Sequence, residues 1–250
     1  MRNETIERRI FRQRWHAAFK ADWLLALAIY AVFLLVRSLP GIPLVWRDTL
    51  YVLVIATPWL LVDLQAWGEV GLQWPRPRWY AYLGTGLGLV IGLFWTLAHY
   101  GIAYASGNWL SLQAQGLGLI VADRMTTYPL PLYVVMTVIA AVGEELLFRG
   151  LLQGTLQNRF GTRWAIVVQA FLFALVHVAA VDGIPSLEIV TEPVAYWGNV
   201  LATSGVLFAG GLLMGWLRAA SGSVVPSLLF HSVHNLLILG YGLWVLPFLV

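Results

Sequence analysis

Long apolar stretches dominate this sequence and set the first limit on its fold. The stretch from 79 to 104, WYAYLGTGLGLVIGLFWTLAHYGIAY, contains no Asp, Glu, Lys or Arg. A helix that crosses a bilayer needs about 20 such residues. Only 11% of the chain is charged, whereas a soluble domain carries about 25%. We therefore expect an all-α, polytopic membrane protein rather than a water-soluble globule.

Seven apolar segments are expected to cross the membrane, giving one bundle of about seven to eight transmembrane helices. They lie at about 23–36, 50–62, 79–104, from 128 onward, 164–181, 194–217 and 224–239. The last ten residues, YGLWVLPFLV, are too few for a separate crossing and are expected to form a short eighth helix. The stretch 108–123 is expected to be interfacial or re-entrant.

The chain is expected to hold one transmembrane domain over 21–250, preceded by a basic segment over 1–20. That segment is expected to be an amphipathic helix on the membrane or a solvated basic tail. If the N-terminus is cytoplasmic, the outside segments hold only Arg37, Arg47 and Arg124 of the 15 lysines and arginines, apart from Arg149 within a span. This bias fits the positive-inside rule. We expect a multi-pass protein of a prokaryotic cell membrane with a cytoplasmic N-terminus.

Two features of the composition exclude whole classes of function. The chain has no cysteine, which excludes disulfides, thiolate metal sites and cysteine nucleophiles. Its net charge is only +3, and the basic residues are spread over the expected helix ends. We therefore expect the lipid bilayer as a partner and no nucleic acid.

Ionisable residues inside the expected spans mark a candidate site. Each costs about 2.5–3.5 kcal/mol on insertion scales, so it normally faces the bundle interior and has a partner. The ionisable residues that stand out are Glu144, Glu145 and Arg149 in the fourth span, His177 in the fifth, and His231 and His234 in the seventh, which also carries the polar Asn235.

Helical spacing indicates which of these side chains meet. Glu145 and Arg149 are four residues apart and share a face, as do His231 and Asn235. Glu144 points about 100° away from Glu145, so the two carboxylates are expected to differ in role. Glu144 and His177 lie equally far from the turn near 158–161, so they are expected at one depth. His231 is nearer to its own turn at 221–223, which is shallower by the same measure, but the turns need not lie at equal heights. A cluster of one glutamate, two histidines and one asparagine from three helices is therefore expected.

This set of residues suits hydrolysis by an activated water. A glutamate in an apolar pocket is suited to act as a general base, and a histidine opposite it would orient the same water. A second histidine and an amide four residues later would donate hydrogen bonds to an oxyanion. No serine or cysteine nucleophile with its own base is evident, which favours direct attack by water.

Three motifs resemble one known family. EELLFR matches EExxxR, FALVH matches FxxxH and HSVHN matches HxxxN, in this order on successive expected spans between about 128 and 240. They resemble the CPBP family of intramembrane endopeptidases, which includes the type II CAAX prenyl protease and the bacterial Abi proteins. The resemblance implies that Glu144 and His177 activate water, and that His231 and Asn235 form the oxyanion hole. It also implies that Glu145 and Arg149 support the site.

Other interpretations remain open at this point. Glu144, His177 and His231 would be the ligands if the same protease used zinc, although no cofactor is required by the mechanism above. The chain would otherwise be a non-catalytic scaffold or immunity protein, or a proton-coupled transporter using Glu144 and His177. Glu145 with Arg149 would then be only a structural ion pair. His234 is expected to face lipid or support the site from behind, while Asp63 and His99 are assigned to packing or an interface.

The substrate is expected to be either a prenylated CAAX tail or a membrane-associated peptide precursor. A prenyl group would need a groove between helices, which the glycine-rich segment 83–93 would line. Tight helix packing is the favoured explanation of those glycines. The sequence leaves the oligomeric state open.

Overall fold

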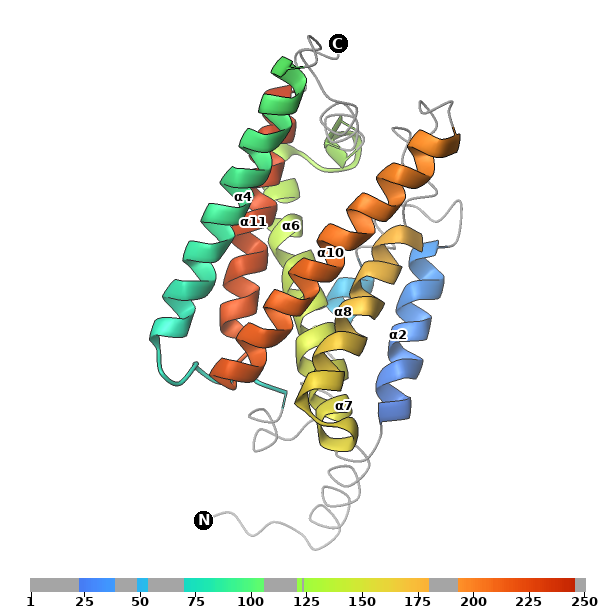
Figure 1. Cartoon of the computed structure of the whole chain (residues 1–250), viewed down its shortest axis with the longest axis vertical. Helices are drawn as coiled ribbons and strands as arrows, with labels where there is room; N and C mark the ends of the chain where they lie inside the picture. Colours follow the sequence, from blue (N-terminus) through green and yellow to red (C-terminus); the bar gives the residue numbers. More distant parts are fainter. Residues whose placement is uncertain are drawn as a thin grey trace, which may run out of the picture.

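The structure is a computed structural model, and it describes residues 23–38, 49–53, 70–105, 121–122, 124–179 and 193–245. The described residues form helices and turns, and they contain no strand. The principal helices are α2 (Trp23–Ser38), α4 (Trp79–Ala105), α6 (Leu130–Glu145), η2 (Leu146–Leu152), α7 (Gln153–Phe160), α8 (Thr162–Ala179), α10 (Pro193–Ser221) and α11 (Val225–Val245). Figure 1 shows them as an elongated bundle. The predicted all-α fold is confirmed for this part of the chain.

A continuous helical rod over Leu130–Phe160 runs through the middle of the bundle. It consists of α6, the π-helix η2 and α7, and the backbone stays right-handed helical at both junctions. It begins after Pro129, whose extended backbone and lack of an N–H suit a helix start. It ends at Gly161, where φ is +82° and the chain turns back into α8.

The other helices pack around this rod. α8 lies beside α7 and α10, α11 lies beside α4 and α6, and α2 contacts η2, α7 and α8 (Figure 1). Every residue of η2 is buried. The hydrophobic core is centred on Leu147, Phe148, Leu151 and Leu152 of this π-helix, joined by side chains from α2, α8, α10 and α11. Helices far apart in the sequence therefore meet around the segment that follows Glu145.

Glycines of α4 allow that helix to lie directly against α11. A Cβ atom at Gly84 would be 2.1 Å from the carbonyl oxygen of Pro226, and one at Gly88 would be 2.6 Å from that of Phe230. One at Gly92 would be 2.7 Å from a methyl carbon of Leu237. Real Cβ atoms do not approach other atoms this closely, so positions 84 and 88, which face backbone oxygens, require glycine, whereas at position 92 the Leu237 side chain would have to move. The favoured prediction of tight helix packing is confirmed.

A segment before α4 covers the turn between α10 and α11. The backbone N–H of Val224 donates to the carbonyl of Gly71 (2.9 Å), and that of Arg76 donates to the carbonyl of Ser221 (3.3 Å). The hydroxyl of Ser223 donates to the carbonyl of Gln73 and accepts from the backbone N–H of Val225. These bonds satisfy polar groups of the turn and fix where α11 starts.

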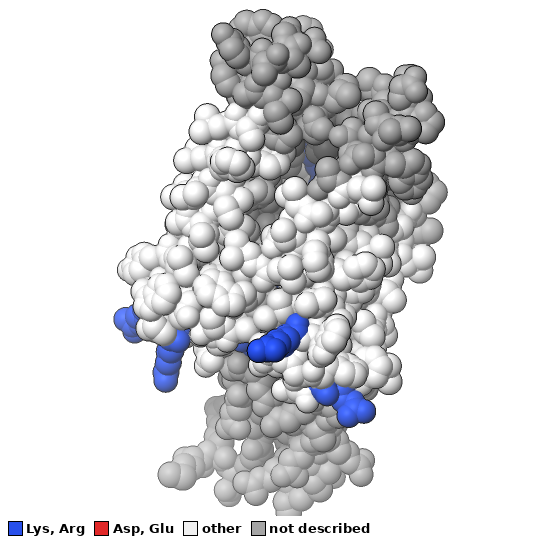
Figure 2. Space-filling view, viewed as in Figure 1, with Lys and Arg blue, Asp and Glu red and all other residues white. Residues whose placement is uncertain are grey.

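The outer faces of the bundle are apolar. Large hydrophobic side chains are exposed along α4, including Val90, Phe94 and Leu97, and comparable side chains are exposed on α2, α8 and α10. Figure 2 shows the described part of one face as almost wholly uncharged, with arginine side chains near its lower end. Apolar surface of this extent is unfavourable in water and is expected where lipid covers the protein.

By length and composition, two helical stretches of the described part are able to cross a membrane, Trp79–Ala98 and Leu130–Phe160. Shorter apolar helices lie at Trp23–Val36 and Thr162–His177. Helices α10 and α11 occupy the sixth and seventh predicted spans, and the total of seven to eight crossings stays a prediction. Four stretches lie wholly or mostly outside the described residues: the second predicted span, the segments 1–20 and 108–123, and the loop 181–193.

One prediction about the C-terminus is wrong. Residues 241–245 continue α11 instead of starting a separate eighth helix. No proline interrupts the sequence between Pro226 and Pro247, so nothing in the covalent chain stops the helix near residue 240.

Candidate active site

Glu144 lies where three polar side chains from other segments converge. Its Oε1 accepts a hydrogen bond from the hydroxyl of Tyr51 (2.9 Å). Its Oε2 is 3.6 Å from Nε2 of His177 and 3.7 Å from Nε2 of His231. The carboxylate is nearly closed off from solvent, while the His177 side chain remains about one quarter exposed. The cluster therefore has one accessible side, at His177.

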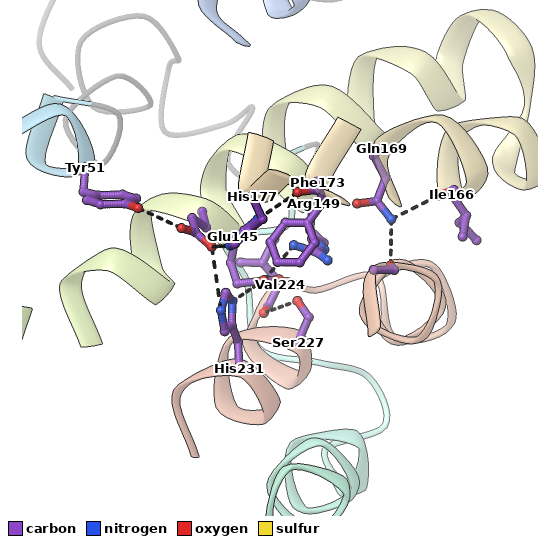
Figure 3. Close-up of polar contacts among 12 residues, drawn as sticks. Tyr51, Glu145, Arg149, Ile166, Gln169, Phe173, His177, Val224, Ser227 and His231 are labelled. Carbon is purple, nitrogen blue, oxygen red and sulfur yellow. Dashed lines mark hydrogen bonds and ion pairs between the residues drawn. The ribbon is translucent and has the colours of Figure 1, made fainter. Parts of the chain in front are cut away.

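Glu145 faces a second set of partners. Its Oε1 accepts from Nη1 of Arg149 and contacts Nδ1 of His231, both at 2.9 Å. Glu145 and Arg149 are completely buried. The predicted ion pair between them is present, and it also reaches the histidine. Figure 3 shows His231 of α11 below Glu145 and pointing toward it.

Hydrogen-bond partners define the tautomers of both histidines. Nδ1 of His177 is 2.8 Å from the carbonyl oxygen of Phe173, which only accepts. Nδ1 must therefore carry the proton, and a neutral His177 presents the lone pair of Nε2 to Glu144. The same logic applies to His231, because its Nδ1 faces a carboxylate oxygen. Oε2 of Glu144 and the Nε2 atoms of the two neutral histidines are therefore all acceptors. Both Nε2 atoms also lie too far from Oε2 for a direct hydrogen bond.

The ring of Phe173 packs against Arg149 and against the two histidines of the site. The guanidinium carbon of Arg149 lies 4.4 Å from the ring centroid of Phe173. That ring is also 4.5 Å from the imidazole of His177 and 5.9 Å from that of His231. Among the described residues, Nε and Nη2 of Arg149 have no hydrogen-bond partner. Stacking on Phe173 therefore adds to the stabilisation that the Glu145 carboxylate gives this buried cation.

The π-helix begins immediately after the two glutamates. Its hydrogen bonds connect residues five apart, which changes the register of side chains relative to an α-helix. π-Helical turns occur often at functional sites. The predicted divergence of Glu144 and Glu145 is correct because both residues precede the change of register.

The structure brings both histidines to the depth of Glu144. Glu144 and His177 lie at one level, as the 3.6 Å distance shows. His231 reaches the same level instead of a shallower one. The turn before α11 is itself buried beneath residues 71–76, so α11 starts deeper in the molecule than α8 does (Figure 1).

Asn235 and His234 are not part of the carboxylate cluster. Among the described residues, no hydrogen bond or ion pair connects Asn235 with Glu144, His177 or His231; its side chain interacts with the adjacent His234. The His234 ring is half-buried and stacks on Phe230, with 6.0 Å between centroids. Its backbone lies against Gly92 of α4. Asp63 and the side chain of His99 lie outside the described residues.

The described residues contain no group of three or more His, Asp or Glu side chains arranged as a metal site. The two Nε2–Oε2 separations at Glu144 slightly exceed the ~3.4 Å expected between two ligands about 2.1 Å from a tetrahedral zinc ion. A small inward movement of the side chains would be needed to bind zinc here.

Sequence reasoning missed Tyr51 and the role of Phe173. Tyr51 is one of 10 tyrosines and lies in an apolar run that carries no motif, so only the tertiary structure identifies it. Phe173 is the aromatic residue of the FxxxH motif, and its fixed spacing from His177 was a usable signal.

Comparisons with known proteins agree with the motifs. Residues 126–237 match the family model described as type II CAAX prenyl endopeptidase Rce1-like. The match covers less than half of the chain and includes all three motifs. Searches of curated proteins and of solved structures find no match.

Proposed function

We propose that this chain is an intramembrane endopeptidase, because residues 126–237 match the type II CAAX prenyl endopeptidase Rce1-like family model. It hydrolyses a peptide bond near the membrane with a water activated by Glu144 and His177. The observation that carries the proposal is the convergence of two Nε2 atoms on Oε2 of Glu144, at 3.6 and 3.7 Å.

The hydrogen-bonding capacity of these atoms suits a water molecule. Oε2 of Glu144 and Nε2 of a neutral His177 are both acceptors, and one water has two O–H groups to donate. Their 3.6 Å separation is short enough for a single water to bridge them. Such a water would be held with its oxygen lone pairs free to attack a carbonyl carbon.

The proton follows a simple path in this mechanism. As the water oxygen bonds to the carbonyl carbon, Glu144 takes one of its protons. When the carbon–nitrogen bond breaks, Glu144 returns that proton to the leaving amine. Glu144 thus ends in its starting state, and the net reaction is the addition of one water across the peptide bond.

Oxyanion stabilisation by His231 requires a protonated imidazole. With Nδ1 donating to Glu145, Nε2 of His231 becomes a donor only in the imidazolium. Glu144 and Glu145 together carry one more negative charge than Arg149 balances, and a proton on His231 would neutralise the buried cluster. Asn235 would have to turn away from His234 to serve as a second donor.

The family supports a prenylated CAAX tail as substrate, with a membrane-associated peptide precursor as the alternative. Either would approach from the accessible side at His177. We further propose that the protein is multi-pass with its N-terminus in the cytoplasm. Arginines 76, 78, 159 and 163 then lie on the cytoplasmic side, consistent with the positive-inside rule.

Zinc held by Glu144, His177 and His231 is the alternative mechanism; it would lower the pKa of the attacking water. The two mechanisms are separated by assaying purified protein on a quenched peptide that ends in a farnesylated CAAX tetrapeptide. Activity that survives exhaustive chelation supports direct water activation. Activity that is lost on chelation and restored by zinc supports the metal.

The decisive experiment compares cells carrying the wild type with cells carrying Glu144→Ala at matched expression. Mass spectrometry of peptides and membrane-protein termini should show specific termini that are lost in the variant. Those termini would identify substrate and cleavage site together. Identical termini, with a phenotype that appears only when the whole chain is deleted, would overturn the proposed activity in favour of a scaffold.

A further inference from the structure

Tyr51 contacts the Glu144 carboxylate directly from outside the family-matched segment 126–237. Its hydroxyl is 2.9 Å from Oε1, while the two histidines face Oε2. Figure 3 shows Tyr51 approaching from the side opposite to Arg149. We propose that Tyr51 is a positioning residue that fixes the orientation of the Glu144 carboxylate; this rests on the function proposed above.

The physical reason lies in the terminal torsion of glutamate. Rotation about this torsion is broad and only weakly restricted by the side chain itself. A free carboxylate would therefore spend much of its time with neither oxygen directed at the histidines. A phenol hydrogen bond to one oxygen fixes the plane of the group and directs the other oxygen at the bridging point.

The surroundings of Tyr51 show that its own position is tightly defined. The residue is buried, and its ring meets Phe33 of α2 edge to face, with 5.5 Å between centroids. Gly143 lies against it: a Cβ atom there would be 2.9 Å from Cδ1 and 3.0 Å from Cβ of Tyr51. The glycine immediately before Glu144 thus permits the approach that brings the phenol to the carboxylate.

Tyr51→Phe removes the hydroxyl and keeps the ring. A hydrogen bond to a charged group contributes about 1.5–3 kcal/mol, so we expect kcat to fall about tenfold to a hundredfold. KM should stay within about twofold, because the phenol touches the base and not the peptide. The matched control is Tyr30→Phe, which removes the hydroxyl of another buried tyrosine, one that donates to the carbonyl of Leu172 (3.0 Å).

A second variant reaches the same contact from the other side. Gly143→Ala displaces the Tyr51 ring without altering its hydroxyl, so it should also lower kcat. In the Tyr51→Phe background the alanine should have much less additional effect, because the contact is already lost. Additive losses would mean that the two positions act independently, and would contradict the proposal.

The assay uses the farnesylated CAAX peptide and purified full-length protein. A large loss of kcat in Tyr51→Phe, with Tyr30→Phe close to wild type, supports the proposal. If both phenylalanine variants match the wild type, the positioning role is overturned and the proposed function stands. A folded wild type that cleaves no peptide, in this assay or in cells, overturns the function and the positioning role together.

Discussion

The adjacent residues Glu144 and Glu145 have different environments although they share one residue type and one helix turn. Glu144 meets a phenol and two imidazole nitrogens, and it borders the accessible side of the cluster. Glu145 is fully buried and shares one oxygen between Arg149 and His231. The first environment suits a base that takes up and releases a proton. The second suits a permanent charge that holds a cation and a histidine in place.

This difference predicts opposite patterns for two matched variants. Glu145→Gln removes the carboxylate that is hydrogen-bonded to the buried Arg149 cation, so we expect the free energy of unfolding to fall by about 3 kcal/mol. Glu144→Gln should abolish cleavage yet change stability by less than about 1 kcal/mol. Both are measured by reversible unfolding in mixed micelles together with the peptide assay. Equal destabilisation by the two variants would contradict the division of roles.

Helix packing fixes the position of the site at the scale of elements. His231 follows Phe230, whose carbonyl lies where a side chain at Gly88 of α4 would be. The distance between α4 and α11 therefore determines how far His231 extends toward the rod over Leu130–Phe160. The π-helix η2 supplies the buried core on which α2, α8 and α10 converge.

Gly88→Ala should force α4 and α11 apart. The new Cβ would be 2.6 Å from the carbonyl oxygen of Phe230, so we expect a loss of about 1–3 kcal/mol in stability and a lower kcat. Gly86→Ala is the matched control because a Cβ there meets nothing within 4 Å. Alanine at 86 should stabilise the helix by up to about 1 kcal/mol. Similar behaviour of the two variants in thermal unfolding would rule out the packing argument.

One end of the whole molecule is rich in arginine and aromatic residues. Arg76, Arg78, Arg159 and Arg163 are exposed there, with the exposed rings of Trp79 and Trp164 beside them. The start of α2 lies at the same end, since Trp23 contacts Phe160. Arginines favour the cytoplasmic side, and tryptophans favour the level of the lipid headgroups. This end is therefore the one we assign to the cytoplasm.

The assignment predicts the accessibility of single cysteines, which the chain allows because it has none of its own. Thr162→Cys lies at the first residue of α8, and Ser38→Cys lies at the last residue of α2; both sites are exposed. A membrane-impermeant maleimide should label the cysteine at 38 in intact cells, and the one at 162 only after permeabilisation. The reverse pattern would invert the proposed orientation.

Much of this protein follows from local sequence. Apolar runs of sufficient length give helices whatever surrounds them, because a buried backbone must satisfy its own hydrogen bonds. The spacing within EELLFR gives the Glu145–Arg149 pair directly. Equal distances from a common turn place Glu144 opposite His177. Each of these depends on residues that are near in sequence or joined by a short turn.

The tertiary structure decided what local spacing does not contain. It placed His231 at the level of Glu144 by burying the turn before α11 under residues 71–76. It introduced a π-helix after Glu145, directed Asn235 toward His234, and brought Tyr51 to the carboxylate across 93 residues of sequence. By itself, the sequence determined the helices and the chemical groups of the site. Their distances were set by how the helices pack, because packing depends on the volumes of side chains that meet only after folding.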